Sequence, residues 1–268
     1  MSNSPSGNFE KDVMATNSVL IPDSLASFPK FTGGFSLPSL GNQSFFRQSI
    51  STEITCQNRR DLAEALGIHP TWITTPRLIH SGIVKIAEKK DRGRGGLTPM
   101  PHFGECDGII TQTSNLFPLV TAADCLPILF WEPLLPVWGA VHAGRRGLER
   151  GILSNTVKAF LSLGVEIEHL HVVIGPSIHS CCYEVDQKTM EFFCSKRGSA
   201  FAEKRQDRYF LDLPGSAIHE LLENKIPEKN IEWISHCTFC HPQKYFSARR
   251  DGPFFQTFAA IIGVKENE

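Results

Sequence analysis

The sequence lacks any long hydrophobic run. No stretch of about 18 apolar residues is present, which is the length that a helix needs to span a bilayer. The N-terminal residues, MSNSPSGNFEKDV, also lack the charged and then apolar pattern of a secretory signal. We therefore expect no membrane partner and a cytoplasmic location.

A dominant charge is missing as well. The chain has 27 Lys and Arg residues against 28 Asp and Glu residues, which gives a formal net charge of -1 at pH 7. No overall electrostatic field attracts nucleic acid or an acidic membrane surface. We expect no nucleic-acid partner, and an anionic ligand must be recognised by local groups.

The eight cysteines form no recognisable disulfide framework, because their spacing is irregular and the chain is long. Reduced thiols, one or more of them functional, are expected instead. Cys237 and Cys240 form a C-x-x-C motif without a partner motif. Cys181 and Cys182 are not expected to supply it, since adjacent side chains in an extended segment point to opposite faces. These four cysteines are therefore predicted to be structural or incidental.

The 268 residues and 41 % hydrophobic composition fit one domain with a sizeable core. The Ser-, Asn- and Pro-rich residues 1–28 predict a flexible arm, and residues 29–268 a single catalytic domain. Strands and helices alternate irregularly, which argues against a purely parallel sheet. Strands are predicted near 72–87, 108–111, 119–121, 126–130, 137–142, 170–174 and 231–235, and helices near 58–66, 148–163, 187–194 and 214–224.

His80, Cys125 and His142 form a candidate metal-ligand set. Cys125 follows Asp124 at the junction of two apolar segments, and His142 ends a predicted strand. One thiolate and two imidazoles suit zinc, and three protein ligands leave a fourth position open for chemistry. Their spacing does not show that they meet, so a buried thiol and two hydrogen-bonded histidines remain an alternative.

The segment from Gly144 to Gly147 is a candidate anion cradle. Its two glycines let the backbone approach a ligand where a strand turns into a helix, and Arg145 and Arg146 add positive charge. A solvent-facing turn would have the same pattern. Similarly, the two arginines and the aspartate of residues 246–252 are either a structural corner or part of a substrate rim.

Several motifs together resemble one family. T-A-A-D-C-L-P-I at 121–128, A-V-H-A-G-R-R-G-L at 140–148, I-G-P-S-I at 174–178, C-Y-E-V at 182–185 and C-T-F-C…F-S-A-R-R-D-G at 237–252 closely resemble the laccase-domain family. Members of this family were once called multicopper polyphenol oxidases and are now regarded as purine nucleoside phosphorylases. The resemblance runs from about residue 31 to residue 262.

The resemblance implies an α+β fold, a layered α/β/β/α sandwich with mixed sheets inside and helices outside. It also implies a zinc site with His80, Cys125 and His142 as ligands, copper being less expected, and a nucleoside and phosphate as partners. Family members are described as phosphorolysing adenosine, inosine and methylthioadenosine, and as deaminating adenosine. Other descriptions are a laccase-like oxidase and a peptidoglycan-editing amidase.

The chain departs from the family pattern at Arg145, where relatives usually have Trp, and around Leu78–Ser81, where they have Q-x-H-G.

The positions of further residues, close to the ligands in sequence or beside predicted turns, suggest roles for them in these reactions. Asp124 would move protons in catalysis or orient a histidine ligand. Arg59, Gly144, Arg146 and Gly147 would bind substrate, with Arg146 positioning phosphate. A Cys–His hydrolase, with Cys125 as the nucleophile and His80 or His142 as the base, is the main alternative. A copper oxidase fits less well, because the paired H-x-H motifs of a trinuclear cluster are absent. The oligomeric state is left open.

Overall fold

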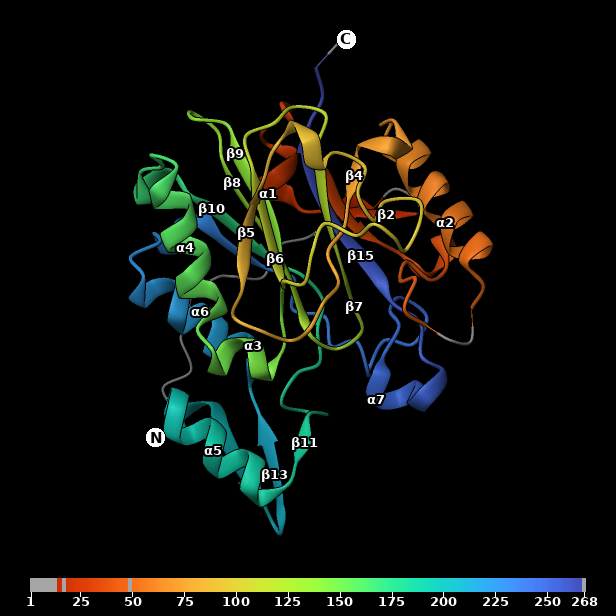
Figure 1. The fold of residues 1–268 in the computed structure, drawn as a ribbon. Coiled ribbons are helices and arrows are strands. Elements are labelled where there is room, and N and C mark those ends of the chain that lie inside the picture. The colour runs from red at the N-terminus through yellow and green to blue at the C-terminus, as the bar shows by residue number, and fades with distance from the viewer. Residues whose placement is uncertain (1–13, 16–17, 48–49, 267–268) are drawn as a thin grey trace.

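The computed structural model describes residues 14–15, 18–47 and 50–266. These residues form two six-stranded sheets, one three-stranded sheet and a set of covering helices (Figure 1). The first sheet has, in spatial order, β1 (Met14–Ala15), β2 (Val19–Ile21), β3 (Phe31–Ser36), β15 (Phe258–Val264), β7 (Phe117–Ala122) and β4 (Ile73–Thr74). The second has β14 (Ile231–Trp233), β10 (His171–Ile174), β8 (Leu126–Glu132), β9 (Val137–Ala143), β6 (Gly108–Thr111) and β5 (Val84–Ala87).

The third sheet and the helices complete the described structure. The third sheet is formed by β11 (Glu184–Val185), β13 (Arg208–Leu211) and β12 (Ala202–Arg205). The α-helices are α1 (Asp23–Ala26), α2 (Thr52–Ala65), α3 (Arg145–Glu149), α4 (Ile152–Ser162), α5 (Gln187–Arg197), α6 (Leu213–Glu223) and α7 (Ala248–Asp251). Short 3-10 helices lie at Pro38–Leu40, Pro70–Trp72, Lys89–Asp91, Ile167–His169, Ser199–Phe201, Glu228–Asn230 and Gly252–Phe254.

Both large sheets are mixed, as predicted. In the second sheet, β8 pairs antiparallel with β9 and β10, whereas β5 pairs parallel with β6 and β14 pairs parallel with β10. In the first, β15 pairs antiparallel with β3 and β7, and β4 pairs parallel with β7. The prediction of mixed sheets rather than a parallel, doubly wound sheet is confirmed.

Alternating side chains of the strands build a layered core. On β15, Phe258, Ala260 and Ile262 face the second sheet, while Ala259 and Ile261 pack under α2. Residues of β8 alternate in the same way, one set between the sheets and the other beneath α4 and α6. Each large sheet is therefore covered outside by helices and inside by the other sheet. This confirms the predicted α/β/β/α sandwich.

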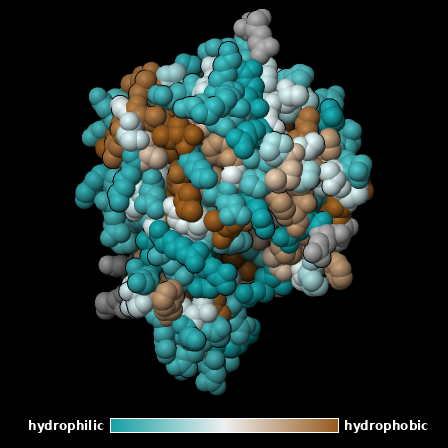
Figure 2. All heavy atoms as spheres, viewed as in Figure 1, coloured by the Kyte–Doolittle hydropathy of each residue, from teal (hydrophilic) through white to brown (hydrophobic). Residues whose placement is uncertain are grey.

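The third sheet and α5 form a small lobe at the bottom of Figure 1. Its surface on the face shown in Figure 2 is mostly hydrophilic. Hydrophobic residues gather instead over the β8–β9 turn and along β5, where Leu134 and Ile86 are exposed. Among the described residues, no helix has both the length and the apolar character for crossing a bilayer.

The ordered structure begins earlier than predicted. Val19–Ile21 pairs with β3, and Leu25 of α1 is buried. These residues, which the composition assigned to the flexible arm, are part of the folded domain, because a short apolar run inside the polar segment forms a strand between β1 and β3. The rest of the predicted arm, residues 1–13 and 16–17, lies outside the described residues.

Two element boundaries also differ from those predicted. The helix expected over 58–66 begins at Thr52, where the Ser51 hydroxyl accepts the Ile54 N–H as an N-cap. The helix expected over 148–163 is two helices, α3 and α4, separated at Gly151, which has a φ of +70°. His80 lies in the loop between β4 and β5 rather than in a strand.

Candidate active site

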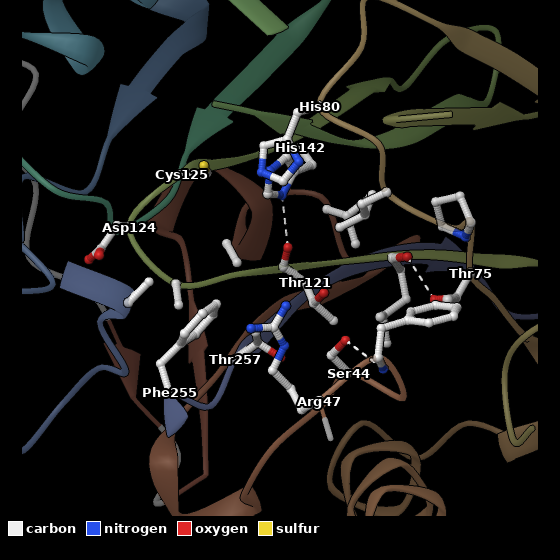
Figure 3. A pocket seen from close by; sticks show the side chains of 18 of the residues that line it. Ser44, Arg47, Thr75, His80, Thr121, Asp124, Cys125, His142, Phe255 and Thr257 are labelled. Carbon is white, nitrogen blue, oxygen red and sulfur yellow. Dashed lines mark hydrogen bonds between the residues drawn. The ribbon is translucent and has the colours of Figure 1, made fainter. Parts of the chain in front are cut away.

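The three predicted metal ligands converge at one end of the β8–β9 hairpin. One potential ligand atom from each of His80, Cys125 and His142 lies within 4.8 Å of the other two. The two imidazole rings meet edge to face, with their centroids 5.0 Å apart (Figure 3). The hairpin register pairs Leu126 with Ala143, so that Cys125 and His142 reach the same edge of the sheet. The geometry therefore brings together residues up to 62 positions apart in the sequence.

One ring nitrogen of His142 has no hydrogen-bond partner among the described residues and can bind a ligand. Its Nδ1 lies 2.8 Å from the backbone oxygen of Thr121, an acceptor, so Nδ1 carries the proton and donates (Figure 3). Its Nε2 is consequently an unprotonated acceptor, and it is buried without a hydrogen-bond partner. Burial and the neighbouring His80 lower the pKa of His142 to about 4, which keeps the ring neutral. A buried, neutral imidazole with a free Nε2 suits a metal ion.

Asp107 holds the loop that carries the other histidine. Its carboxylate oxygens accept the backbone N–H groups of His80 at 2.9 Å and of Ser81 at 2.6 Å. Its backbone oxygen accepts the His142 N–H at 2.7 Å. His80 has a φ of +56°, an unfavourable conformation for a non-glycine residue, and these hydrogen bonds offset its cost. Asp107 thus positions both histidines.

Gly144 has no side chain and so leaves open space beside Cys125 and His80. A Cβ atom at this position would lie 2.6 Å from the Cys125 Sγ and 3.4 Å from the His80 Cδ2. Burial, with Asp124 and Asp107 nearby, raises the pKa of the Cys125 thiol to about 12. A thiolate at this position needs a compensating cation, which a divalent metal ion supplies. The two imidazoles, the thiol and the open space beside them fit zinc in their donor chemistry.

The three residues border a pocket of about 560 Å³. Its wall also holds Arg47, whose guanidinium lies 4.0 Å from the centre of the Phe255 ring (Figure 3). The Arg47 Nε is buried without a hydrogen-bond partner, and burial lowers the pKa of this side chain. The lining residues are Ser44, Phe46, Arg47, Arg59, Thr75, Pro76, Arg77, Leu78, His80, Leu119, Val120, Thr121, Ala122, Ala123, Asp124, Cys125, His142, Ile178, Tyr183, Ala248, Arg249, Phe255 and Thr257.

A comparison with known protein families shows to which family this chain belongs. Residues 32–265 match the family model described as multi-copper polyphenol oxidoreductase laccase. The chain belongs to this laccase family. The match covers both large sheets apart from the first two strands, and it includes all three residues of the candidate metal site.

Relatives within the laccase family carry a more specific name. The mouse protein named purine nucleoside phosphorylase LACC1 is 31 % identical over 265 residues, which is 95 % of this chain but 59 % of the mouse protein. The Geobacillus stearothermophilus protein named purine nucleoside phosphorylase YlmD is 30 % identical over 78 % of each chain. The chain thus spans about three-fifths of the length of the mouse relative.

Solved structures of similar proteins share the fold. The crystal structure of YlmD from Geobacillus stearothermophilus superposes with a TM-score of 0.88 at 25 % identity, covering 94 % of this chain and 98 % of that one. The Bacillus licheniformis protein YfiH gives the same TM-score and identity over 94 % of this chain and 99 % of its own.

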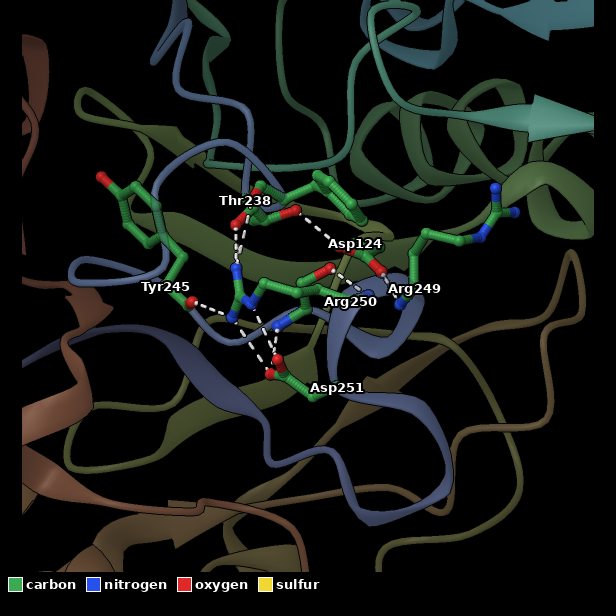
Figure 4. A network of polar contacts seen from close by, with 8 residues as sticks. Asp124, Thr238, Tyr245, Arg249, Arg250 and Asp251 are labelled. Carbon is green, nitrogen blue, oxygen red and sulfur yellow. Dashed lines mark hydrogen bonds and ion pairs between the residues drawn. The ribbon is translucent and has the colours of Figure 1, made fainter.

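Asp124, predicted to act in catalysis, braces the rim of the pocket. One carboxylate oxygen accepts the Thr238 hydroxyl at 2.6 Å and the other accepts the Arg249 N–H at 2.7 Å (Figure 4). The carboxylate points away from the two histidine rings (Figure 3). These contacts favour a structural role over proton transfer or orientation of a histidine.

Arg59, predicted to bind substrate, lines the pocket but is occupied by the protein. Its guanidinium donates to the backbone oxygens of Gln43, Gly95 and Gly96 through four hydrogen bonds. Arginine has five N–H donors, so at most one remains for a ligand. Burial lowers the pKa of Arg59 to about 9. Arg59 thus connects α2 to two loops of the wall.

The predicted cradle from Gly144 to Gly147 borders the metal ligands but is not part of the pocket wall. Arg146 is exposed, and its charge contributes to a lowered pKa at His80, after the larger effect of burial. Arg145 pairs with Glu149 at 2.6 Å. It also donates a hydrogen bond to Tyr183 of the pocket wall.

Three residues of the candidate active site were missed in the sequence. Asp107 directly precedes a buried strand, a position where side chains gather at a sheet edge, and this signal could have found it. Arg47 and Phe255 lie in segments without regular periodicity, and nothing in their sequence context predicts that they meet. The contact between them depends on the tertiary structure.

Cys181, Cys182, Cys237 and Cys240 were predicted to be structural or incidental, and their arrangement favours the structural alternative. The sulfur atoms of Cys181, Cys182, Cys237 and Cys240 all lie within 4.8 Å of one another. The expectation that Cys181 and Cys182 point to opposite faces assumed an extended segment, whereas both lie in a turn. None of the eight cysteines forms a disulfide.

Proposed function

We propose that this chain is a zinc-dependent purine nucleoside phosphorylase that acts on adenosine, inosine or methylthioadenosine. The observation that carries the proposal is the buried, unpaired Nε2 of His142 beside Cys125 and His80, at the edge of a pocket that also contains Arg47, whose Nε has no hydrogen-bond partner. The names of the relatives support the substrate class. Zinc held by the three side chains supplies Lewis-acid charge at the pocket wall.

In phosphorolysis, a phosphate oxygen attacks C1′ of the ribose while the bond from C1′ to the purine nitrogen breaks. The bonding electrons pass to the purine, which takes up a proton, and the products are the free base and ribose 1-phosphate. Arg47 would bind the phosphate, because its guanidinium enters the pocket with an unused N–H donor. Phe46, Tyr183 and Phe255 offer aromatic surface for the purine.

Adenosine deamination is a second proposed activity, because a zinc ion with an open fourth position activates water. Zinc deaminases bind their metal through one histidine and two cysteines, or through cysteines alone, and use a separate carboxylate to move protons. Among the described lining residues, Asp124 is the single carboxylate, and both of its oxygens are engaged. The pocket therefore fits phosphorolysis better than deamination.

The two alternative enzyme classes receive less support. A Cys–His hydrolase needs a ready thiolate, whereas burial raises the pKa of the Cys125 thiol to about 12. A copper oxidase of the laccase type needs a further cluster of histidines. Within the described residues, the two groups of candidate metal ligands contain two histidines in all, both of them in the site already described.

Product analysis tests the proposal. The purified protein, with its metal content measured, is incubated with adenosine in the presence and absence of phosphate. Adenine and ribose 1-phosphate formed only with phosphate are the expected products. Inosine formed without phosphate would establish the deaminase activity instead. No turnover under either condition, with zinc bound, would overturn the assignment to nucleosides.

A further inference from the structure

Four cysteines come together on two loops that contact Asp124 through Ile178 and Thr238. The Cys240 Sγ lies 3.3 Å from the Cys182 Sγ and 3.8 Å from the Cys181 Sγ. With Cys237, the four sulfur atoms lie within 4.8 Å of one another. Cys237 is buried, whereas Cys181 and Cys240 are exposed. Two loops can pair through their backbones without any sulfur atoms, so the pairing of the loops does not explain four neighbouring thiols.

The backbone holds the two cysteine-bearing loops together. Ser177 and Cys237 form a parallel β-bridge, and the Thr238 N–H donates to the Ser177 oxygen at 2.9 Å. The turn at Cys181 and Cys182 is closed by the Cys182 N–H, which donates to the His179 oxygen at 2.9 Å. This turn lets adjacent cysteines present both sulfurs to the C-x-x-C loop. The cluster is thus built by ordered backbone on both sides.

The spacing of the sulfurs fits a tetrahedral thiolate site. Zinc–sulfur bonds of about 2.3 Å place the sulfur atoms of such a site about 3.8 Å apart. A disulfide would need its two sulfurs at about 2.05 Å and would use only two of the four thiols. Small side-chain rotations bring distances between 3.3 and 4.8 Å to the tetrahedral value.

Hydrogen-bond donors and a positive charge lie beside the four sulfur atoms. The backbone N–H groups of His179 and Cys240 donate to the Cys237 sulfur. Arg205 donates to the Ser180 oxygen at 3.2 Å, which places its guanidinium beside Cys181 and Cys182. Its charge offsets part of the net charge of about -2 that four thiolates and a divalent ion carry.

We propose that Cys181, Cys182, Cys237 and Cys240 bind a second metal ion, a zinc ion in a closed, four-thiolate structural site. Binding releases the four thiol protons and forms four metal–sulfur bonds, with no change of oxidation state. The site is separate from the proposed nucleoside chemistry and does not depend on it.

Such an ion would fix the rim of the pocket. The turn at Cys182 leads directly into Tyr183, and the C-x-x-C loop contains Thr238, which holds Asp124. Arg250 donates to the backbone oxygens of Thr238 and Phe239 and so ties this loop to α7 (Figure 4). Loss of the ion would loosen these walls without removing a ligand of the first site.

Metal content of purified protein tests the proposal. The full chain is prepared with zinc in the growth medium, and zinc per chain is measured by plasma emission spectroscopy. We expect two zinc ions per chain in the parent, one in His142→Ala, and one in the double variant Cys181→Ser/Cys240→Ser. Cys194→Ser is the matched control, since Cys194 lies outside the cluster, and it should retain two.

A second measurement applies if the double variant does not fold. His142→Ala protein is loaded with Co²⁺ in place of zinc, and its visible and near-ultraviolet spectrum is recorded. Intense tetrahedral bands with strong thiolate-to-cobalt charge transfer are expected for four sulfur ligands. Absence of these bands would overturn the proposal. So would equal zinc in the parent and the double variant, or a disulfide between Cys182 and Cys240 in freshly purified protein.

Discussion

At the scale of single residues, the candidate active site depends on a carboxylate that is not itself a ligand. Asp107 is fully buried, and its three oxygens accept hydrogen bonds from the backbone of His80, Ser81 and His142. It also accepts the Ser81 hydroxyl at 2.7 Å. Positioning groups of this kind matter for metal affinity almost as much as the ligands do.

Asp107→Asn should weaken zinc binding at this site by about 10- to 100-fold. The new amide nitrogen cannot accept the N–H and O–H of Ser81, so the His80 loop loses its support. Zinc affinity is measured by competition with a chelator, in protein whose four-cysteine cluster has been removed. Glu105→Gln, an exposed change in the same loop, is the control and should leave the affinity unchanged. Equal affinity in Asp107→Asn would contradict the positioning role.

Arg47→Ala should raise the KM for phosphate by about 10- to 100-fold and the KM for nucleoside much less, since it removes a charged hydrogen-bond donor from the pocket. Arg146→Ala removes an exposed charge outside the pocket wall, and a smaller effect on the phosphate KM is expected. Steady-state kinetics with each substrate varied in turn gives both constants. If Arg146→Ala has the larger effect, phosphate binds at the Gly144–Gly147 turn instead.

The sequence allowed different parts of the site to be predicted to different degrees. His80, Cys125 and His142 were identified through motifs shared with a family, because their spacing alone does not show that they meet. Arg47 could not be predicted, since its place in the pocket depends on the packing of its loop against Phe255. Positions created by tertiary contacts leave no local pattern.

At the scale of elements, α2 is anchored to the pocket wall through one side chain. Arg59 is 1 % exposed and donates to the oxygens of Gln43, Gly95 and Gly96, while its guanidinium lies 4.6 Å from the centre of the Phe45 ring. The helical pattern predicted α2 but not its start at Thr52, because residues 52–54 are exposed and add nothing to the buried face. Amphipathic periodicity reports only the buried face of a helix.

Arg59→Ala should lower the free energy of unfolding by about 3 kcal/mol or more, since it leaves three backbone oxygens without their donors in a buried place. Urea unfolding followed by circular dichroism measures the change. Arg60→Ala, at the exposed neighbouring position of the same helix, is the matched control and should change stability by less than about 0.5 kcal/mol. Similar effects for the two variants would contradict the anchoring role.

At the scale of the whole molecule, two sheets face each other and enclose an aromatic cluster. Trp131 and Trp138 are buried between the sheets, and His171 stacks on Trp131 with ring centroids 5.4 Å apart. The mixed, layered architecture was predictable from the irregular alternation of strands and helices. The arm boundary was not, since β2 is held by its pairing with β3 rather than by its own composition. The cytoplasmic location stays a prediction.

The His171 ring gives the stability of the molecule a pH dependence. Burial, then the charges of Lys229 and His169, lower the pKa of His171 to about 4, against about 6.5 in an unfolded chain. The unfolded chain therefore binds more protons between these values, and stability falls as the pH is lowered from about 6.5 to about 4. His171→Phe keeps the stacked ring and should make this fall smaller.

Urea midpoints of the parent and His171→Phe at pH 7.5 and pH 5 check this expectation. His219→Phe, a change at an exposed histidine, is the control and should keep the pH dependence of the parent. An unchanged difference between the two pH values in His171→Phe would show that His171 does not contribute.

We propose that the site of His80, Cys125 and His142 supports phosphorolysis when it holds zinc. The release of hypoxanthine from inosine, with phosphate present, is measured with metal-depleted protein as zinc is added back. We expect zinc to restore hypoxanthine and ribose 1-phosphate formation in the parent protein and not in His142→Ala. Full activity of the metal-depleted protein, or equal activity of His142→Ala, would contradict it.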